Sequence, residues 1–249
     1  MLKVLPDQIS NLIAAGEVIQ RPASVVKELV ENAVDAGASS VQVIINDSGR
    51  TLIQVIDNGC GMTKEEAVLC FERHATSKIS KAEDLYHIST YGFRGEALAS
   101  IAACGEITMK SRKEGEETGT EVCIAESKIV SCCETGAAQG TNIAVRNIFY
   151  NIPARRKFLK SDNYEFRQIL SELIKIALTK TGIEFKLIHN SKTLMHLPVT
   201  ENIKQRIIQI DGINSAKDLI NLNVSTHVAG ISGYVGNPQK KKKNQQNQY

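Results

Sequence analysis

The chain has 249 residues, of which 42% are hydrophobic and 23% charged, and these are ordinary values for a soluble globular protein. No apolar run approaches the roughly 20 residues that a bilayer-spanning helix needs, and no long apolar signal segment opens the chain, so we expect a cytoplasmic protein. The net charge of +3 comes from the lysine run 240–243 and gives no argument for nucleic-acid binding, and the six cysteines include no Cys-x-x-Cys pair that could begin a zinc site.

The first predicted helix covers residues 21–36, with a proline in its first turn and Gly37 just beyond its end. Its apolar residues fall in one arc of about 100°, which we expect to face the core. Glu28, Asn32 and Asp35 lie in a neighbouring arc of about 60°. Taken alone, such a polar triple is more often a solvated helix face than a binding site.

Two strands are predicted next, at residues 41–45 and 51–56, because both runs alternate between apolar and polar residues. The second strand ends at Asp57, which begins the glycine-rich turn 57–62 (DNGCGM). Glycines let the backbone approach a ligand closely or take left-handed dihedral angles. A strand ending in Asp-Asn-Gly is nevertheless more often only a hairpin or loop turn.

A further helix is predicted over residues 64–72, since the Thr-x-x-Glu spacing at 63–66 is that of a capping box. The polar stretch 73–90 has no clean periodicity and is long enough to be a lid. The sequence GFRG at 92–95 then leads into a helical segment, 96–103, an arrangement that suits anion binding. By itself, Gly-x-x-Gly before a helix is more often a tight turn.

The rest of the first domain alternates strands with one long helix. Helices and antiparallel strands in this order predict a two-layer α+β domain, not a doubly wound sheet. The predicted strands cover residues 107–111, 121–125, 128–133, 141–146, 183–189 and 193–197. Asp162 with Glu165 resembles a helix start, and the helical spacing covers 166–179.

A domain boundary is predicted near residue 199, where the pattern of elements starts again. We expect a first domain at 1–199 and an incomplete second domain at 200–238. The tail 239–249 is rich in Lys, Asn and Gln and too polar to pack, so we expect it to be disordered. The second domain would contain a helix at 203–210 and strands at 219–224 and 228–234.

Four features call for one explanation: the polar helix edge, the Asp57 turn, the glycine loop 92–95 and the Gly-Thr pair at 140–141. A nucleotide bound with a metal suits them together. Asp57, assisted by Thr141, could accept from the exocyclic amine of adenine, and glycine turns with a helix N-terminus could bind phosphates. The Asn32 amide oxygen suits Mg²⁺. Glu28 lies one helical turn from Asn32, which makes it the candidate base for hydrolysis.

The same strings resemble the four motifs of the GHKL ATPases, a family that includes gyrase-type topoisomerases and histidine kinases. They are ELVENAVDAG at 28–37, DNGCGM at 57–62, GFRGEAL at 92–98 and GT at 140–141. Within that family, further strings are similar to the MutL group of DNA mismatch repair proteins, and the similarity extends over about residues 5–236. These further strings cover residues 13–22, 73–79, 92–101 and 149–159.

The resemblance implies a Bergerat-type fold, a two-layer sandwich of helices on a mixed, mostly antiparallel sheet. It also implies a truncated second α/β domain of the transducer type. Glu28 would be the water-activating base, Asn32 the magnesium ligand and Asp57 the adenine acceptor. The full set of implied ATP-binding residues is Asn32, Asp35, Asp57, Gly61, Met62, Thr76, Ser77, Lys78, Gly92, Phe93, Arg94, Gly95, Glu96, Ala97, Leu98 and Thr141.

In such proteins ATP brings two N-terminal regions together, and the homodimer acts as a clamp on DNA. The implied partners are mismatched DNA, the mismatch-recognition protein MutS and a downstream repair nuclease or helicase, at the nucleoid if the source is bacterial. The family continues into a segment with a lysine that reaches the ATP phosphates, and this segment is missing here. The alternative to a weak ATPase is therefore a nucleotide-gated interaction module that binds ATP without significant turnover.

Two other features are given no catalytic role. His74 is expected to pack or to form a hydrogen bond within the lid. The basic run 155–157 could meet a DNA phosphate, but such a run is more often a solvated linker.

Overall fold

The structure is a computed structural model. It describes residues 7–78, 81, 83–84, 90–92, 94–213 and 217–237, with the backbone alone for 7–12. The predictions for Phe93, for the middle of the lid stretch and for the tail 239–249 lie outside the described residues.

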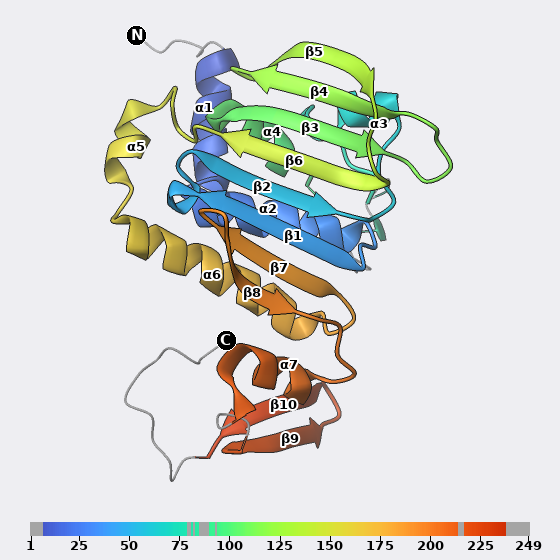
Figure 1. Ribbon diagram of the computed structural model, residues 1–249, viewed down its shortest axis with the longest axis vertical. Coiled ribbons are helices and arrows are strands. Elements are labelled where there is room, and N and C mark those ends of the chain that lie inside the picture. Colours follow the sequence, from blue (N-terminus) through green and yellow to red (C-terminus); the bar gives the residue numbers. More distant parts are fainter. Residues whose placement is uncertain are drawn as a thin grey trace.

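The centre of the fold is an eight-stranded mixed sheet with the strand order β5-β4-β3-β6-β2-β1-β7-β8 (Figure 1). β1 and β7 run parallel, and the other described neighbours in the sheet are antiparallel. This confirms the predicted mixed, mostly antiparallel sheet. The strands are β1 (Ser40–Asn46), β2 (Leu52–Asp57), β3 (Glu106–Arg112), β4 (Gly119–Ala125), β5 (Lys128–Thr135), β6 (Gly140–Arg146), β7 (Glu184–His189) and β8 (Lys192–Leu197).

Helices cover one face of this sheet, and the other face is open (Figure 1). α2 and α6 pack side by side, and α1 packs against α4. The two layers together are the α+β sandwich that the order of elements predicted. The helices of this domain are α1 (Asp7–Val18), α2 (Pro22–Asp35), α3 (Lys64–Leu69), α4 (Ala97–Cys104), α5 (Pro153–Phe158) and α6 (Asp162–Thr179).

The core lies between the two layers and follows from the sequence periodicity. Every second residue of β1 is buried, as is every second residue of β3. The apolar arc of α2 is buried at Val25, Val26, Leu29 and Ala33, and Ala36 at the helix end is half-buried. Burying one such side chain contributes about 1.5–3 kcal/mol, so the matching faces of helix and strand hold the layers together.

The capping box before α3 is present as predicted. The Glu66 backbone N–H donates to Thr63 Oγ1 at 3.3 Å, and the Thr63 backbone N–H donates to Glu66 Oε2 at 2.9 Å. The helix ends at Leu69, earlier than the predicted residue 72. The following residues continue as turns toward the lid.

Two helices were not predicted from the sequence. α1 packs against α4, and Ala15 on α1 and Ile19 just beyond its end are fully buried. α5 contains the basic run, so the interpretation of that run as a solvated linker is wrong for Arg155. The Arg155 guanidinium lies over the Phe149 ring, 6.0 Å from its centroid, and fills the space that a Cβ at Gly16 would take. Arg156 and Lys157 are exposed.

A smaller unit follows β8 and has its own two-stranded antiparallel sheet (Figure 1). It consists of α7 (Ile203–Asp211), β9 (Leu219–Ser225) and β10 (Gly230–Gly236), close to the predicted ranges. The domain boundary at residue 199 and the transducer type of this unit stay predictions. None of the helices in the described part of the chain is long and apolar enough to cross a membrane.

Arg206 on α7 joins the smaller unit to the sandwich. Its residue is fully buried. The guanidinium donates to the backbone oxygens of Leu197, Lys180, Thr181 and Ile183 over 2.7–3.3 Å, and its Nη1 also reaches a side-chain oxygen on α7. Nothing in the sequence pattern marked this residue. Three of these carbonyls follow the C-terminus of α6, and two of them, those of Lys180 and Thr181, also accept a backbone N–H group.

Candidate functional site

A cavity of about 820 Å³ lies between α2, the end of β2, the lid and the start of α4. It brings together residues that are far apart in the sequence. Every predicted site residue except Phe93, which is outside the described residues, lines it. These are Glu28, Asn32, Asp35, Asp57, Gly61, Met62, Thr76, Ser77, Lys78, Gly92, Arg94, Gly95, Glu96, Ala97, Leu98 and Thr141.

Asp57 forms the sheet side of the cavity, at the end of β2. Its Oδ1 accepts the backbone N–H groups of Gly59 at 2.9 Å and Thr141 at 3.3 Å. Both donors thus go to one oxygen, and Oδ2 has no partner among the described residues. Burial raises the pKa of the Asp57 carboxyl group, and the two N–H donors lower it in part. The site therefore offers one oriented acceptor oxygen to a ligand.

Gly140 allows β6 to begin directly beside Asp57. Its φ is +104°, and a Cβ there would lie 2.1 Å from the Asp57 backbone oxygen. We expect Gly140→Ala to lower the free energy of unfolding by about 1–3 kcal/mol, because it combines backbone strain with a steric clash. Urea unfolding measures this loss.

Gly136→Ala is the matched control, since a Cβ at Gly136 would meet nothing within 4 Å. If both variants lost the same stability, the close approach at Gly140 would not be the cause.

A buried hydroxyl group supports this side of the cavity. Ser111 on β3 is fully buried, and its Oγ donates to the Gly140 backbone oxygen at 3.0 Å. Ser111 Oγ also accepts the Met62 backbone N–H and lies 3.0 Å from Thr141 Oγ1. Ser111 could not be recognised from the sequence, because its importance comes from partners that are distant along the chain. Its bonds hold Met62 and Thr141 in place.

Glu28 lies on the opposite side of the cavity, on α2. Lys27 Nζ bridges its Oε1 at 3.3 Å and Glu31 Oε2 at 2.9 Å. The second oxygen of Glu28 has no partner among the described residues and can accept from water. Burial raises the pKa of Glu31, and Lys27 opposes this in part. Lys27 and Glu31 both line the cavity, and the sequence analysis named neither.

The lid meets α2 through Lys78. Its ammonium donates to Asp35 Oδ2 in a short ion pair and to Asn32 Oδ1 at 3.4 Å. The backbone N–H groups of Tyr91 and Gly92 also donate to the Asp35 carboxylate, at 3.0 Å and 3.2 Å. Asp35 therefore contacts donors of the protein itself on both oxygens, although the resemblance implied a contact with ATP.

The fourth side of the cavity is the N-terminus of α4. The first N–H groups of a helix have no partners within it and attract anions. Gly95 leads into this end with φ +61°, and a Cβ there would lie 2.4 Å from the Ala75 backbone oxygen. Glu96 pairs with His74, at 3.4 Å, which agrees with the lid contact expected for that histidine. The geometry suits a phosphate group.

Among the described residues, no cluster of three or more His, Cys, Asp or Glu side chains could hold a metal ion. Mg²⁺ does not require one, because it is often bound by one or two protein oxygens, substrate phosphates and waters. The position of the Lys78 ammonium shows that a cation fits beside Asn32 Oδ1. The residues present therefore fit a magnesium ion that arrives with a nucleotide.

Comparison with known proteins agrees with this arrangement. Residues 20–133 match the family described as histidine kinase-, DNA gyrase B- and HSP90-like ATPase. The DNA mismatch repair protein MutL of Christiangramia forsetii is 49% identical over all 249 residues, which is 40% of that protein. MutL of Parabacteroides distasonis is 53% identical over 243 residues, covering 98% of this chain and 39% of that protein.

A solved structure is similar as well. The Aquifex aeolicus MutL ATPase domain complexed with ADP is 31% identical, with a TM-score of 0.65, over 83% of this chain and 73% of that chain. The chain spans about 40% of the length of the curated relatives it matches. The comparison supports nucleotide binding by this fold.

Proposed function

This chain belongs to the MutL family and carries its GHKL-type ATPase domain, and from that premise we propose that the cavity binds ATP with Mg²⁺ and hydrolyses it weakly. Adenine would lie against Asp57, the phosphates against the start of α4, and the γ-phosphate near Glu28. The described cavity is large enough for a nucleotide, at about 820 Å³.

The observation that carries this proposal is the unpartnered acceptor at Asp57. Its carboxyl group is held by two backbone donors on one oxygen and offers the other to the cavity. An adenine amine is a donor that such an oxygen recognises. A loop carboxylate with only a structural role would be expected to use both oxygens or to face solvent.

Hydrolysis needs a base beside the attacking water, and Glu28 is placed for that role. The water oxygen would attack the γ-phosphorus, the bond to the β-phosphate oxygen would break, and Glu28 would take the proton. Lys27 holds one Glu28 oxygen, which orients the other. The products are ADP and inorganic phosphate.

A magnesium ion held by Asn32 and the phosphates would neutralise charge that develops on the transferred group. The residues of this chain would supply orientation: Asn32 Oδ1 on α2, Lys78 from the lid and the N–H groups at the start of α4. Thr76 and Ser77 would contact the nucleotide from the lid.

For the intact protein we propose the role that its relatives' names indicate, DNA mismatch repair in the cytoplasm. ATP-dependent homodimerisation, clamping on mismatched DNA, and contacts with MutS and a downstream nuclease or helicase belong to this proposal. The support is the MutL identity of relatives that match the whole chain.

Asp57→Asn is expected to weaken Mg-ADP binding by about 100-fold, or roughly 2.7 kcal/mol. The asparagine would keep one oxygen for the two backbone N–H groups, so its amide NH₂ would turn toward the cavity. Two donors, this NH₂ and the adenine amine, would then face each other, and neither would be satisfied. Calorimetric titration measures the affinity.

Asp47→Asn is the matched control, because Asp47 is exposed at the other end of the β1–β2 hairpin. Its affinity should equal that of the parent chain. Equal affinity in Asp57→Asn as well would contradict the assignment of the adenine site.

A further inference from the structure

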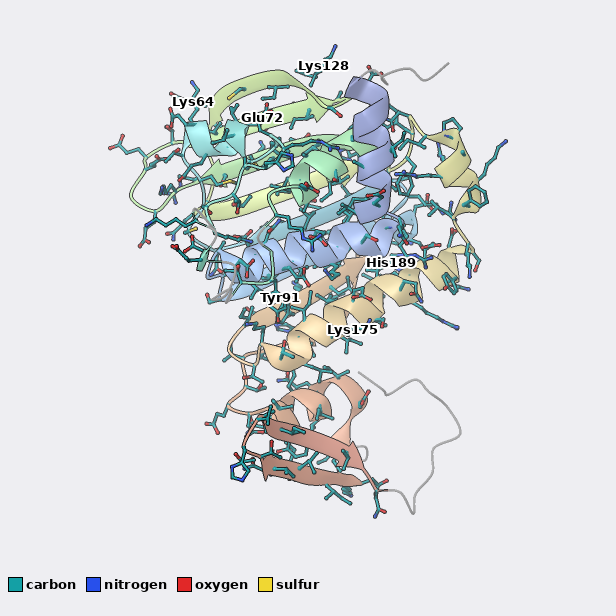
Figure 2. All side chains as sticks on the ribbon, turned by 180° about the vertical axis from the view of Figure 1, so that it is seen from behind. Lys64, Glu72, Tyr91, Lys128, Lys175 and His189 are labelled. Carbon is teal, nitrogen blue, oxygen red and sulfur yellow. The ribbon has the colours of Figure 1, made fainter. Side chains whose placement is uncertain are left out.

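Asp35 accepts donors from two separate stretches of chain, Lys78 in the lid and Tyr91 with Gly92 just beyond it. The side chain is only 5% exposed, and its oxygens accept the Lys78 ammonium from one stretch and the Tyr91 and Gly92 backbone N–H groups from the other. Tyr91 is also anchored elsewhere, because its hydroxyl group lies 3.2 Å from Thr179 Oγ1 and Lys180 Nζ lies 5.0 Å from its ring centroid. Figure 2 shows Tyr91 near the end of α6.

Earlier in the lid, the His74 backbone N–H donates to the Gly95 oxygen at 2.9 Å, and the His74 ring pairs with Glu96. The Lys78 ammonium itself has no comparable second anchor among the described residues. Its other side-chain contact is Asn32 Oδ1, at 3.4 Å. Lys78 is 22% exposed, so its ammonium is largely removed from water and depends on the Asp35 carboxylate. This is not a freely solvated surface pair, for which the contribution would be close to zero. Among the described residues, the Lys78 ammonium is therefore held by Asp35 and Asn32 alone, and this contact is the releasable one.

Asn32 Oδ1 is also the oxygen assigned to Mg²⁺. Mg²⁺ binds oxygen at about 2.0–2.1 Å and repels another cation at the same atom. The space is narrow, since even a Cβ at Gly92 would lie 3.2 Å from Lys78 Nζ. Repulsion between the two cations therefore opposes simultaneous binding of the ammonium and the metal ion at this oxygen.

We propose that Lys78 is a latch: its ammonium, held by Asp35, occupies the position of the divalent cation at Asn32. Binding of Mg²⁺ at Asn32 and the resting position of Lys78 oppose one another. The inference rests on the proposed function, because it takes Asn32 as the metal ligand. Arrival of the metal with its nucleotide releases the Lys78 ammonium from Asn32, while the Tyr91 and Gly92 N–H groups stay on Asp35.

The first test measures the affinity of the ADP-saturated protein for Mg²⁺ by calorimetry. Lys78→Met keeps the length of the side chain and removes its charge. We expect it to bind Mg²⁺ about tenfold more tightly than the parent chain, a change of about 1.4 kcal/mol. Unchanged or weaker Mg²⁺ binding would overturn the competition.

Lys27→Met is the matched control. Lys27 lies on α2 and also lines the cavity, but its ammonium contacts Glu28 and Glu31, not Asn32. A general effect of losing one positive charge would raise the Mg²⁺ affinity equally in both variants. The latch requires a clearly larger gain in Lys78→Met, and equal gains would contradict it.

The second test needs no nucleotide. Proton exchange of the Lys78 ammonium, followed by ¹⁵N NMR, should be slower than that of Lys175, whose side chain is 49% exposed. Asp35→Asn should bring the Lys78 rate to that of Lys175. A Lys78 rate already equal to that of Lys175 in the parent chain would overturn the latch. If no form of the protein bound ADP, the proposed function would fail, and this exchange measurement would still decide whether Lys78 is held.

Discussion

Replacing Glu28 by Gln is expected to lower ATP turnover by about 10²–10⁴-fold, while Mg-ADP affinity changes little. The amide cannot take a proton from water, but it keeps the size of the side chain and can still contact Lys27. The loss should therefore appear in the chemical step and not in binding. Single-turnover hydrolysis with protein in excess, together with calorimetry, separates the two quantities.

Two further variants make this test more specific. Glu172→Gln changes a partly exposed carboxylate of α6 that pairs with Lys175 and should have no effect on turnover. Glu31→Gln changes the other carboxylate that contacts Lys27. Loss of turnover in Glu31→Gln, together with normal turnover in Glu28→Gln, would show that the base is Glu31. No turnover in the parent chain would favour a nucleotide-gated interaction module.

Replacing Arg206 by Met is expected to lower the free energy of unfolding by roughly 3–5 kcal/mol. The change removes a buried fork of donors from backbone oxygens, among them that of Ile183, and leaves those of Lys180 and Thr181 with a backbone N–H partner only. Lysine should not rescue the loss, because one ammonium cannot reproduce the planar guanidinium fork. Urea unfolding followed by circular dichroism measures the midpoint and the slope.

Arg167→Met is the control for Arg206, since Arg167 is exposed on α6. It should stay within about 0.5 kcal/mol of the parent chain. A similar small effect in Arg206→Met would mean that α7 does not depend on this side chain for its position. Separate unfolding transitions in Arg206→Met would instead show that Arg206 makes the small unit and the sandwich cooperative.

Most of the fold could be predicted from local patterns. β1 and β3 alternate strictly between buried and half-buried residues, and α2 and α6 have apolar arcs at helical spacing, so these elements show their period. Strand bounds were accurate to within about two residues. α1 and α5 were missed because tertiary packing decides them: Ala15 is buried against α4, and Arg155 fits the space left by Gly16.

The candidate site divides in the same way. Glu28, Asn32 and Asp57 could be named because a helix edge and a strand end place polar groups in recognisable positions. Ser111 and Lys27 could not, since their importance comes from partners that are distant in the sequence or unremarkable by type. The contacts of Asp35 could not be predicted either, because the sequence could not tell that Lys78, Tyr91 and Gly92 would donate to its carboxylate.

By itself, the sequence determined the element types, the layers and the identity of many residues around the cavity, since periodicity and motif spacing are local properties. Only the tertiary structure decided which atoms meet: both backbone donors on one oxygen of Asp57, Lys78 beside Asn32, and Arg206 on carbonyls beyond α6. Whether a hydrogen bond or an ion pair forms depends on differences of a few tenths of an ångström in the distance between atoms of separate elements. Such distances follow from the packing of the whole domain, which no short stretch of the chain contains.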